Sequence, residues 1–301
     1  MKKIFFSIIA VFFINISLSQ SNLLNAKSPN DIDKLSDDSN DGFNLEYDSI
    51  SEQNILWSRV VYEYIDLNEK LNFPLLYPIN DDVFRKSRKS LWKTIYDGIK
   101  SGKITELYEA DNDKFIPNLK IVQNHETPYN DIIDFYVDEA YRNGDINNGQ
   151  QLGSDDILGY NIKGIWYFDK LQSELKYRLL GIQPYGIDVK DKFTSELESR
   201  ETLKSVYPWI WYPSIRKILH ESKVFNEKNN SNSISFDDLL INRRFSSFIY
   251  KYNNVYGDRE IKDYIKQRPG ESKQQHNLRL ILESERIKKE ILDFELDMWG
   301  Y

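Results

Sequence analysis

The chain has 301 residues, of which 40% are hydrophobic and 29% are charged, and this is enough for a substantial core in one or two domains. It contains no cysteine, which excludes disulfides, thiolate metal sites and cysteine nucleophiles. The net charge of −7 argues against a nucleic acid as partner.

The first 19 residues are predicted to be a secretory signal peptide. Lys2 and Lys3 precede an apolar run at residues 4–16, which is too short to span a bilayer comfortably. Ser17 and Ser19 supply the small residues that a cleavage site needs. Cleavage removes both lysines and changes the net charge from −7 to −9. We therefore expect an exported protein that is soluble or peripheral to a membrane.

Residues 20–52 are predicted to be an acidic, disordered leader. The segment holds eight acidic residues and two lysines, and its few apolar residues cannot offset the entropy of ordering it. The stretch Asp37–Gly42, with Asp48, loosely resembles a calcium loop, but the last ligand would be Asp rather than Glu and no flanking helices are evident. A solvated acidic linker is the favoured interpretation, and no metal or other cofactor is expected.

Regular structure is predicted to begin near Ile55. Residues 57–65 are rich in β-branched and aromatic side chains and predict a strand. Residues 81–101 predict a helix that Asn80 caps, and a strand is predicted at 103–109. A second helix is predicted at 131–142, before a loop rich in Gly, Asn and Asp.

The centre of the predicted fold is the stretch 157–189, interpreted as two strands joined by a polar turn. Because side chains alternate along a strand, one face would carry Tyr160, Ile162, Gly164, Trp166 and Phe168. A hairpin this aromatic is not stable alone and needs elements that cover its apolar face. The predicted fold class is therefore α+β, with an antiparallel sheet around this hairpin, packed helices and a long C-terminal helix.

The C-terminal part predicts one more strand and three helices. Residues 206–212 predict a short aromatic strand, and Pro213 starts a helix that continues to Val224. Ser235 with Asp238 resembles a capping box for a helix to about Tyr252, and a similar pair precedes a last helix to about Trp299. Two sets of residues seven apart give that helix a coiled-coil-like seam: Leu280, Ile287, Phe294 and Ser284, Ile291, Met298.

Candidate sites are surfaces rather than catalytic centres. The chain has no phosphate-binding glycine loop, and its three histidines lack the spacing of a zinc helix, so no enzymatic activity is expected. Partner binding is the predicted role of two sets, the seam residues Ile287, Ile291, Phe294 and Met298 and the basic residues Arg85, Lys86, Arg88 and Lys89. The basic set is either a solvated helix face or a dock for an acidic partner or phosphorylated lipid headgroups.

Aromatic residues at 166–167 and 207–212 allow two interpretations. Packing into the core is favoured, because aromatic strand residues usually pack. The alternative function is a periplasmic peptidoglycan- or glycan-binding module that stacks sugars on exposed aromatic residues, among them Tyr167, Trp209 and Trp211.

Several ordered motifs between residues 57 and 264 resemble one known family. They are Trp57, Arg59, Ile65–Leu67, Glu69-Lys70, Asn72, Pro74-Leu75 and Tyr77-Pro78; Trp166–Lys170 with Gly181; Trp211–Pro213 with Arg216 and Leu219; Val224–Asn226; Phe236–Leu239; Arg243–Ile249; and Asn254–Tyr256 with Asp258, Arg259 and Ile261. These residues resemble the gliding-motility protein family GldN, called PorN in non-gliding species. The leader and the final helix lie outside the matched motifs.

The resemblance implies a non-enzymatic subunit of the type IX secretion system of Bacteroidetes, required for protein secretion and gliding. It implies a periplasmic location at the outer membrane, and a ring with homo-oligomeric contacts that includes the lipoprotein GldK (PorK). It also implies that the GldL–GldM (PorL–PorM) motor reaches toward that ring. The expected organisation is a signal peptide (1–19), the leader (20–52), a GldN-like α+β core (53–268) and a C-terminal amphipathic helix (269–301).

Overall fold

A computed structural model describes residues 47, 50–79, 89–116, 152–188, 203–224, 234–254 and 258–299. These residues belong to one compact unit. The predicted signal peptide, most of the predicted leader and the predicted helix at 131–142 lie outside the described residues. The same holds for Arg85, Lys86 and Arg88.

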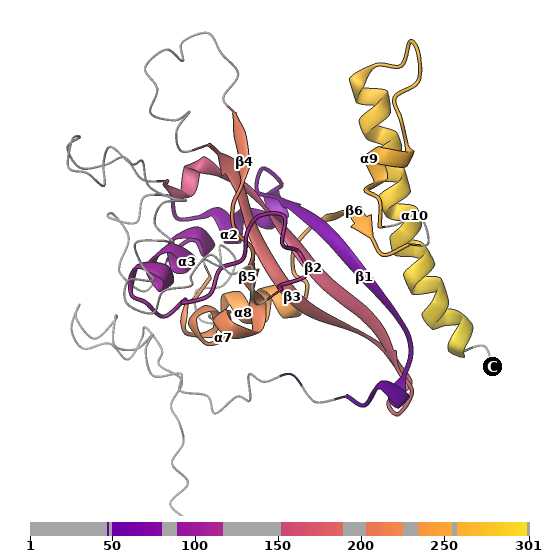
Figure 1. The fold of residues 1–301 in the computed structure, drawn as a ribbon, viewed down its shortest axis with the longest axis horizontal. Coiled ribbons are helices and arrows are strands. Elements are labelled where there is room, and N and C mark those ends of the chain that lie inside the picture. Colours follow the sequence, from indigo (N-terminus) through magenta and orange to yellow (C-terminus); the bar gives the residue numbers. More distant parts are fainter. Residues whose placement is uncertain are drawn as a thin grey trace, which may run out of the picture. The chain divides into compact units, whose positions relative to one another are not determined.

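The described strands form one antiparallel sheet (Figure 1). Its strands are β1 (Ile55–Asp66), β2 (Ile157–Asp169), β3 (Glu174–Ile187), β4 (Lys204–Val206), β5 (Ile210–Trp211) and β6 (Phe248–Tyr252). Their order is β4-β3-β2-β1-β6, and β5 also pairs with β3. The central hairpin β2–β3 and the α+β fold class are therefore confirmed.

The register places the predicted apolar face of the hairpin on the same side as alternate residues of β1. Arg59 lies opposite Trp166, and Glu63 lies opposite Ile162. Directly opposite residues of an antiparallel pair share a face of the sheet. The face that carries Trp166 and Ile162 therefore also carries Trp57, Arg59 and Val61.

Helices cover this face. Among the described residues they are α2 (Phe73–Leu76), α3 (Leu91–Lys100), α7 (Tyr212–Glu221), α8 (Phe236–Ile241), α9 (Ile261–Tyr264) and α10 (Lys273–Trp299). The same ranges contain the short 3₁₀ turns η2 (Glu52–Asn54), η3 (Lys70–Asn72) and η5 (Ser154–Asp156). The largest hydrophobic cluster joins α3, α7 and α8 to the sheet around Ile65, Ile162 and Ile182. A second cluster joins α10 to β1 and β6, and Figure 1 shows α10 beside these strands, away from α3, α7 and α8.

The prediction of one continuous helix over residues 81–101 is wrong, because the chain is extended at Ser90. That residue has φ −70° and ψ 164°, and its hydroxyl oxygen accepts a hydrogen bond from the backbone N–H of Lys93. Such a residue is an N-cap, at which a helix starts. Helix α3 therefore begins at Leu91.

The predicted strand at 103–109 is also wrong. Tyr108 makes only an isolated β-bridge with Trp209. The predicted aromatic strand at 206–212 is divided between β4 and β5, and α7 already begins at Tyr212.

The predicted helix from Ser235 to about Tyr252 is confirmed only in its first half. The capping box at Ser235 and Asp238 is present, but α8 ends at Ile241. Arg243 then adopts a left-handed backbone with φ 51°, which ends a helix. The chain continues as the edge strand β6, which pairs with β1.

Candidate partner-binding surface

The predicted seam of the last helix packs against the protein's own sheet. We call its residues the docked seam: Leu280, Ser284, Ile287, Ile291, Phe294 and Met298. Ile287 and Ile291 are buried, at 0% and 2% exposure, against Val61, Ile249 and Ile261. In this structure the two isoleucines therefore pack against their own chain.

The ends of the docked seam are less enclosed. Phe294 stacks on Trp57 with ring centroids 4.8 Å apart, and Met298 is half-buried. Ser284 is fully buried, and its hydroxyl accepts a 2.7 Å hydrogen bond from the N–H of Ile249. This bond satisfies a β6 backbone donor that faces the helix.

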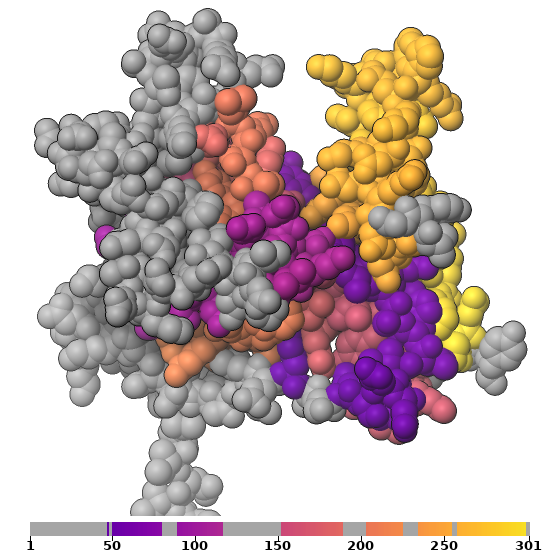
Figure 2. Space-filling view, viewed as in Figure 1, coloured from indigo at the N-terminus to yellow at the C-terminus, as the bar shows by residue number. Residues whose placement is uncertain are grey.

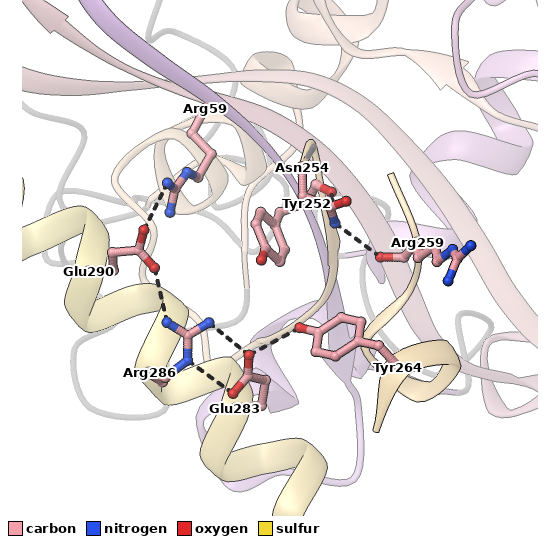
Figure 3. A network of polar contacts seen from close by, with 8 residues as sticks. All are labelled: Arg59, Tyr252, Asn254, Arg259, Tyr264, Glu283, Arg286 and Glu290. Carbon is pink, nitrogen blue, oxygen red and sulfur yellow. Dashed lines mark hydrogen bonds and ion pairs between the residues drawn. The ribbon is translucent and has the colours of Figure 1, made fainter. Parts of the chain in front are cut away.

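A chain of ion pairs runs along one flank of α10 (Figure 3). Arg59 of β1 binds Glu290 at 3.0 Å, and Glu290 also binds Arg286 at 3.1 Å. Arg286 continues to Glu283 at 2.8 Å, where the hydroxyl of Tyr264 donates a further bond of 3.1 Å. These contacts tie α10 to β1 and α9.

The same contacts shift the acidity of both carboxylates. The hydrogen bond from Arg286 lowers the pKa of Glu283 below its usual 4.5, and the hydrogen bond from Arg59 does the same for Glu290. Both side chains therefore carry their negative charge at neutral pH.

A shallow groove of about 450 Å³ lies between α10 and β1. It is lined by Trp57, Arg59, Arg286, Lys289, Glu290, Asp293, Phe294 and Asp297. The groove mixes both signs of charge with two aromatic rings, so it suits a polypeptide surface better than a small anion or cation.

The basic set predicted for partner binding is described only at Lys89. This lysine forms an ion pair with Asp97 of α3, to which Lys93 is also bound, at 3.3 Å. A role of Arg85, Lys86, Arg88 and Lys89 in docking stays a prediction.

Most of the aromatic residues considered for sugar stacking are buried. Tyr167, Trp209 and Tyr212 are 7%, 2% and 0% exposed. Trp211 is half-buried, and its ring meets that of Phe115 at a centroid distance of 4.9 Å. The rings therefore contribute to packing, as the favoured interpretation predicts.

The structure contains two ion pairs with buried carboxylates that the sequence does not indicate. Arg216 of α7 binds Asp237 of α8 through two nitrogens, each at 3.0 Å, and the hydroxyl of Tyr212 donates to the same carboxylate at 2.8 Å. Burial opposes the charge on Arg216, but the hydrogen bonds to Asp237 outweigh it and hold the pKa of Arg216 above its usual value. Asp237 lies in the first turn of α8, where a negative charge suits the helix dipole, and nothing in the sequence indicates its partner.

The second pair joins Glu63 of β1 to Arg243, at 2.7 Å. Glu63 is 1% exposed, and the guanidinium of Arg243 lies over the rings of Trp166 and Tyr177 at 5.2 and 4.2 Å. Tyr177 packs against both large hydrophobic clusters. The pair therefore sits where the α7–α8 side of the core meets the α10 side.

Tyr47 lies within the segment predicted to be disordered, yet it is placed against the sheet. Its hydroxyl donates a 2.9 Å hydrogen bond to the carbonyl of Leu179, and its ring lies under the guanidinium groups of Arg178 and Arg216 at 4.7 and 4.5 Å. Burial raises the pKa of Tyr47 to about 12, so the hydroxyl stays neutral. Ordered structure therefore starts earlier than predicted at this point of the chain.

Within the part of the chain that the structure describes, no group of three or more His, Asp or Glu side chains is arranged to hold a metal ion. None of the helices in the described ranges is both long and apolar enough to cross a membrane. The charged side chains described above form ion pairs between different elements and thereby hold these elements together.

Comparison with known protein families indicates what the chain is related to. No curated protein matches the chain. A family model described as "Gliding motility associated protein GldN" matches residues 50–300. The match includes α10, which lies outside the motifs that first indicated the resemblance. Since it spans most of the sequence and the whole described sheet, the chain belongs to the GldN family of gliding-motility-associated proteins.

Proposed function

We propose that this protein is a non-enzymatic structural subunit of a periplasmic ring in the type IX secretion and gliding machinery. The observation that carries the proposal is the family match over residues 50–300. Membership of the GldN family places the protein among the components of gliding motility and, by implication, of type IX secretion.

The chemistry of the described residues supports a structural role. The most buried charged groups, Glu63 and Asp237, are each neutralised by an arginine from another element. Charges used in this way hold elements in place, and a general acid or base would instead need access to a substrate.

The attachment to the membrane is proposed to be indirect. The chain has no cysteine and therefore no residue for lipidation at a lipobox. A GldK-like outer-membrane lipoprotein would supply the lipid, the ring would contain many copies of both proteins, and the GldL–GldM motor would contact it from the inner membrane.

Co-expression with the lipoprotein partner tests this proposal. We expect gentle detergent extraction to yield large assemblies that contain both proteins and that electron microscopy resolves as rings. If both proteins are folded but elute only as small species, the ring role is wrong. A parallel secretion assay on Asp238→Asn tests the absence of catalysis at this half-buried carboxylate, because the amide keeps an oxygen for the capping box of α8 and secretion should stay intact.

A further inference from the structure

Helix α10 carries a second apolar stripe besides the docked seam. We call it the outer leucine stripe: Leu278, Leu282, Leu292 and Leu296. These leucines are 56%, 59%, 51% and 68% exposed. Single exposed leucines are common on protein surfaces, but a regular row of them on one helix indicates a binding face.

The stripe has the spacing of a coiled-coil seam. With Glu285 and Lys289 between the two leucine pairs, its positions follow one another at intervals of four, three, four, three and four residues. The docked seam has the same spacing, displaced by two residues. Since one residue turns an α-helix by about 100°, the two seams lie on nearly opposite sides of α10.

The outer leucine stripe is also symmetric about its own centre at position 287. Leu278 and Leu296 are each nine residues from this position, and Leu282 and Leu292 are each five residues from it. Glu285 and Lys289 are each two residues from it and carry opposite charges. Reversal of the helix direction thus exchanges leucine with leucine and glutamate with lysine.

This symmetry is what a two-fold contact between identical chains requires. In an antiparallel pair, Leu278 would meet Leu296 of the other copy, and Glu285 would meet Lys289. In a parallel pair, Glu285 would face Glu285 and Lys289 would face Lys289, and like charges in an interface are unfavourable. We propose that the outer leucine stripe binds α10 of a second copy of this chain in the antiparallel direction.

The surroundings of α10 suit this contact. The docked seam and the ion pairs of Figure 3 hold the helix in place, so pairing requires no prior ordering of it. Figure 2 shows the yellow surface of α10 beside the indigo surface that contains β1. Glu285 already binds Lys288 at 2.9 Å, but this pair is worth little on the helix surface, and Lys288 keeps its hydrogen bond to the carbonyl of Ser247 when Glu285 changes partner.

A two-fold contact closes with two copies and cannot by itself extend around a ring. The proposal therefore concerns a contact in addition to the ring contacts, and it is tested on the purified chain without the lipoprotein partner. Failure of ring formation would leave it standing, and its own failure would leave the ring proposal standing.

Charge exchange is the most direct test. Sedimentation velocity on the purified wild-type chain should give a concentration-dependent dimer. Glu285→Lys and Lys289→Glu should each weaken self-association by at least about tenfold, because each puts like charges opposite one another in the two-fold pair. An equimolar mixture of the two variants should dimerise again, since every lysine then faces a glutamate.

Leucine replacement tests the apolar part of the contact. Leu282→Asp and Leu292→Asp should make the chain monomeric, with an unchanged circular dichroism spectrum. Leu171→Asp is the matched control, because Leu171 is 75% exposed in the β2–β3 turn, and this variant should dimerise like the wild type.

Disulfide trapping tests whether the two α10 helices pair in the antiparallel direction. It remains informative even if a charge variant fails to fold. Because the chain has no cysteine, Leu278→Cys and Leu296→Cys introduce a single thiol each. Oxidation of the mixed variants should give a cross-linked dimer, and each variant alone should not, because identical positions would be about 27 Å apart. Self-cross-linking of each single variant would mean a parallel pair. A wild-type chain that stays monomeric up to about 0.1 mM would overturn the proposal and leave the stripe to a different protein.

Discussion

Arg59 of β1 donates a 3.0 Å hydrogen bond to Glu290 of α10, across 231 positions of sequence. Beside it, Trp57 stacks on Phe294, so the start of the first strand is bound to the last helix by both charge and packing. Helix α10 is therefore part of the same hydrophobic core as the sheet. One face of α10 is buried against the sheet, and only the exposed face is accessible to a partner.

Ile291→Ala should lower the free energy of unfolding by about 2–5 kcal/mol, because it leaves a cavity between α10 and the sheet. Ile291 is 2% exposed, whereas its neighbour Leu292 is 51% exposed and serves as the matched control. Urea denaturation followed by tryptophan fluorescence measures both variants. Leu292→Ala should stay within about 0.5 kcal/mol at a protein concentration low enough to prevent association. Equal losses for the two variants would contradict the observed orientation of α10.

The anchoring of α10 should weaken in acid. The folded-state pKa values of Glu283 and Glu290 are lowered by Arg286 and Arg59, so the stabilisation is present above the usual value of 4.5 and is lost as pH falls through the lower folded-state values. We expect the free energy of unfolding to begin to fall near pH 4.5 and to decrease further at lower pH.

Arg59→Gln isolates the contribution of Glu290 to this dependence. The variant should lose about 0.2–1 kcal/mol at neutral pH and show a shallower decline toward low pH. Lys273→Gln, on an exposed residue at the start of α10, is the control and should follow the wild-type pH profile. An Arg59→Gln profile parallel to that of the wild type would show that the pair does not contribute.

The elements that the sequence predicts correctly are those whose signal is local. The alternation of β2 and β3 and the cap of α10 at Ser272 and Gln275 depend only on neighbouring residues, and the structure has both. The end of α8 is different. Arg243 has a left-handed backbone and binds Glu63, which is 180 positions away in the sequence. The periodicity of neighbouring residues cannot predict such a contact.

The same limit applies to the candidate surface. Two seams with the spacing of a coiled coil are present in α10, and the sequence singles out the one with isoleucine and phenylalanine. That seam is the more apolar one, and for this reason it packs against the chain's own sheet. A periodic pattern predicts that a face is buried, but it does not say whether the covering surface is the same chain or another.

Tyr47 should stabilise strand β3 through two separable contacts. Tyr47→Phe removes the hydrogen bond to Leu179 and should cost about 0.5–1.5 kcal/mol. Tyr47→Ala also removes the ring from Arg178 and Arg216 and should cost about 1–2 kcal/mol more. Amide hydrogen exchange in β3 measures the local effect. If both variants exchange like the wild type, Tyr47 is not bound in solution.

Asp237→Ala should destabilise the protein strongly, because it leaves the buried guanidinium of Arg216 without a counter-charge. The expected loss is about 3–5 kcal/mol in chemical denaturation. Asp238→Ala is the neighbouring control, since it removes only a capping interaction worth about 0.5–2 kcal/mol. A loss of secretion by Asp237→Ala at full stability would instead indicate a catalytic role and contradict the structural one.

Gly181 should not tolerate a side chain, because Phe115 occupies the space beside it. A Cβ built on Gly181 would lie 2.3 Å from Cζ of the Phe115 ring, well inside van der Waals contact. The Phe115 ring is held edge-on against Tyr108, at 5.2 Å between centroids, so it has little room to move. Gly181→Ala should therefore cost about 1–3 kcal/mol. The double variant with Phe115→Leu should recover part of this loss relative to Phe115→Leu alone, because the smaller side chain makes room for the methyl group. Additive losses in the double-mutant cycle would contradict a direct contact between the two positions.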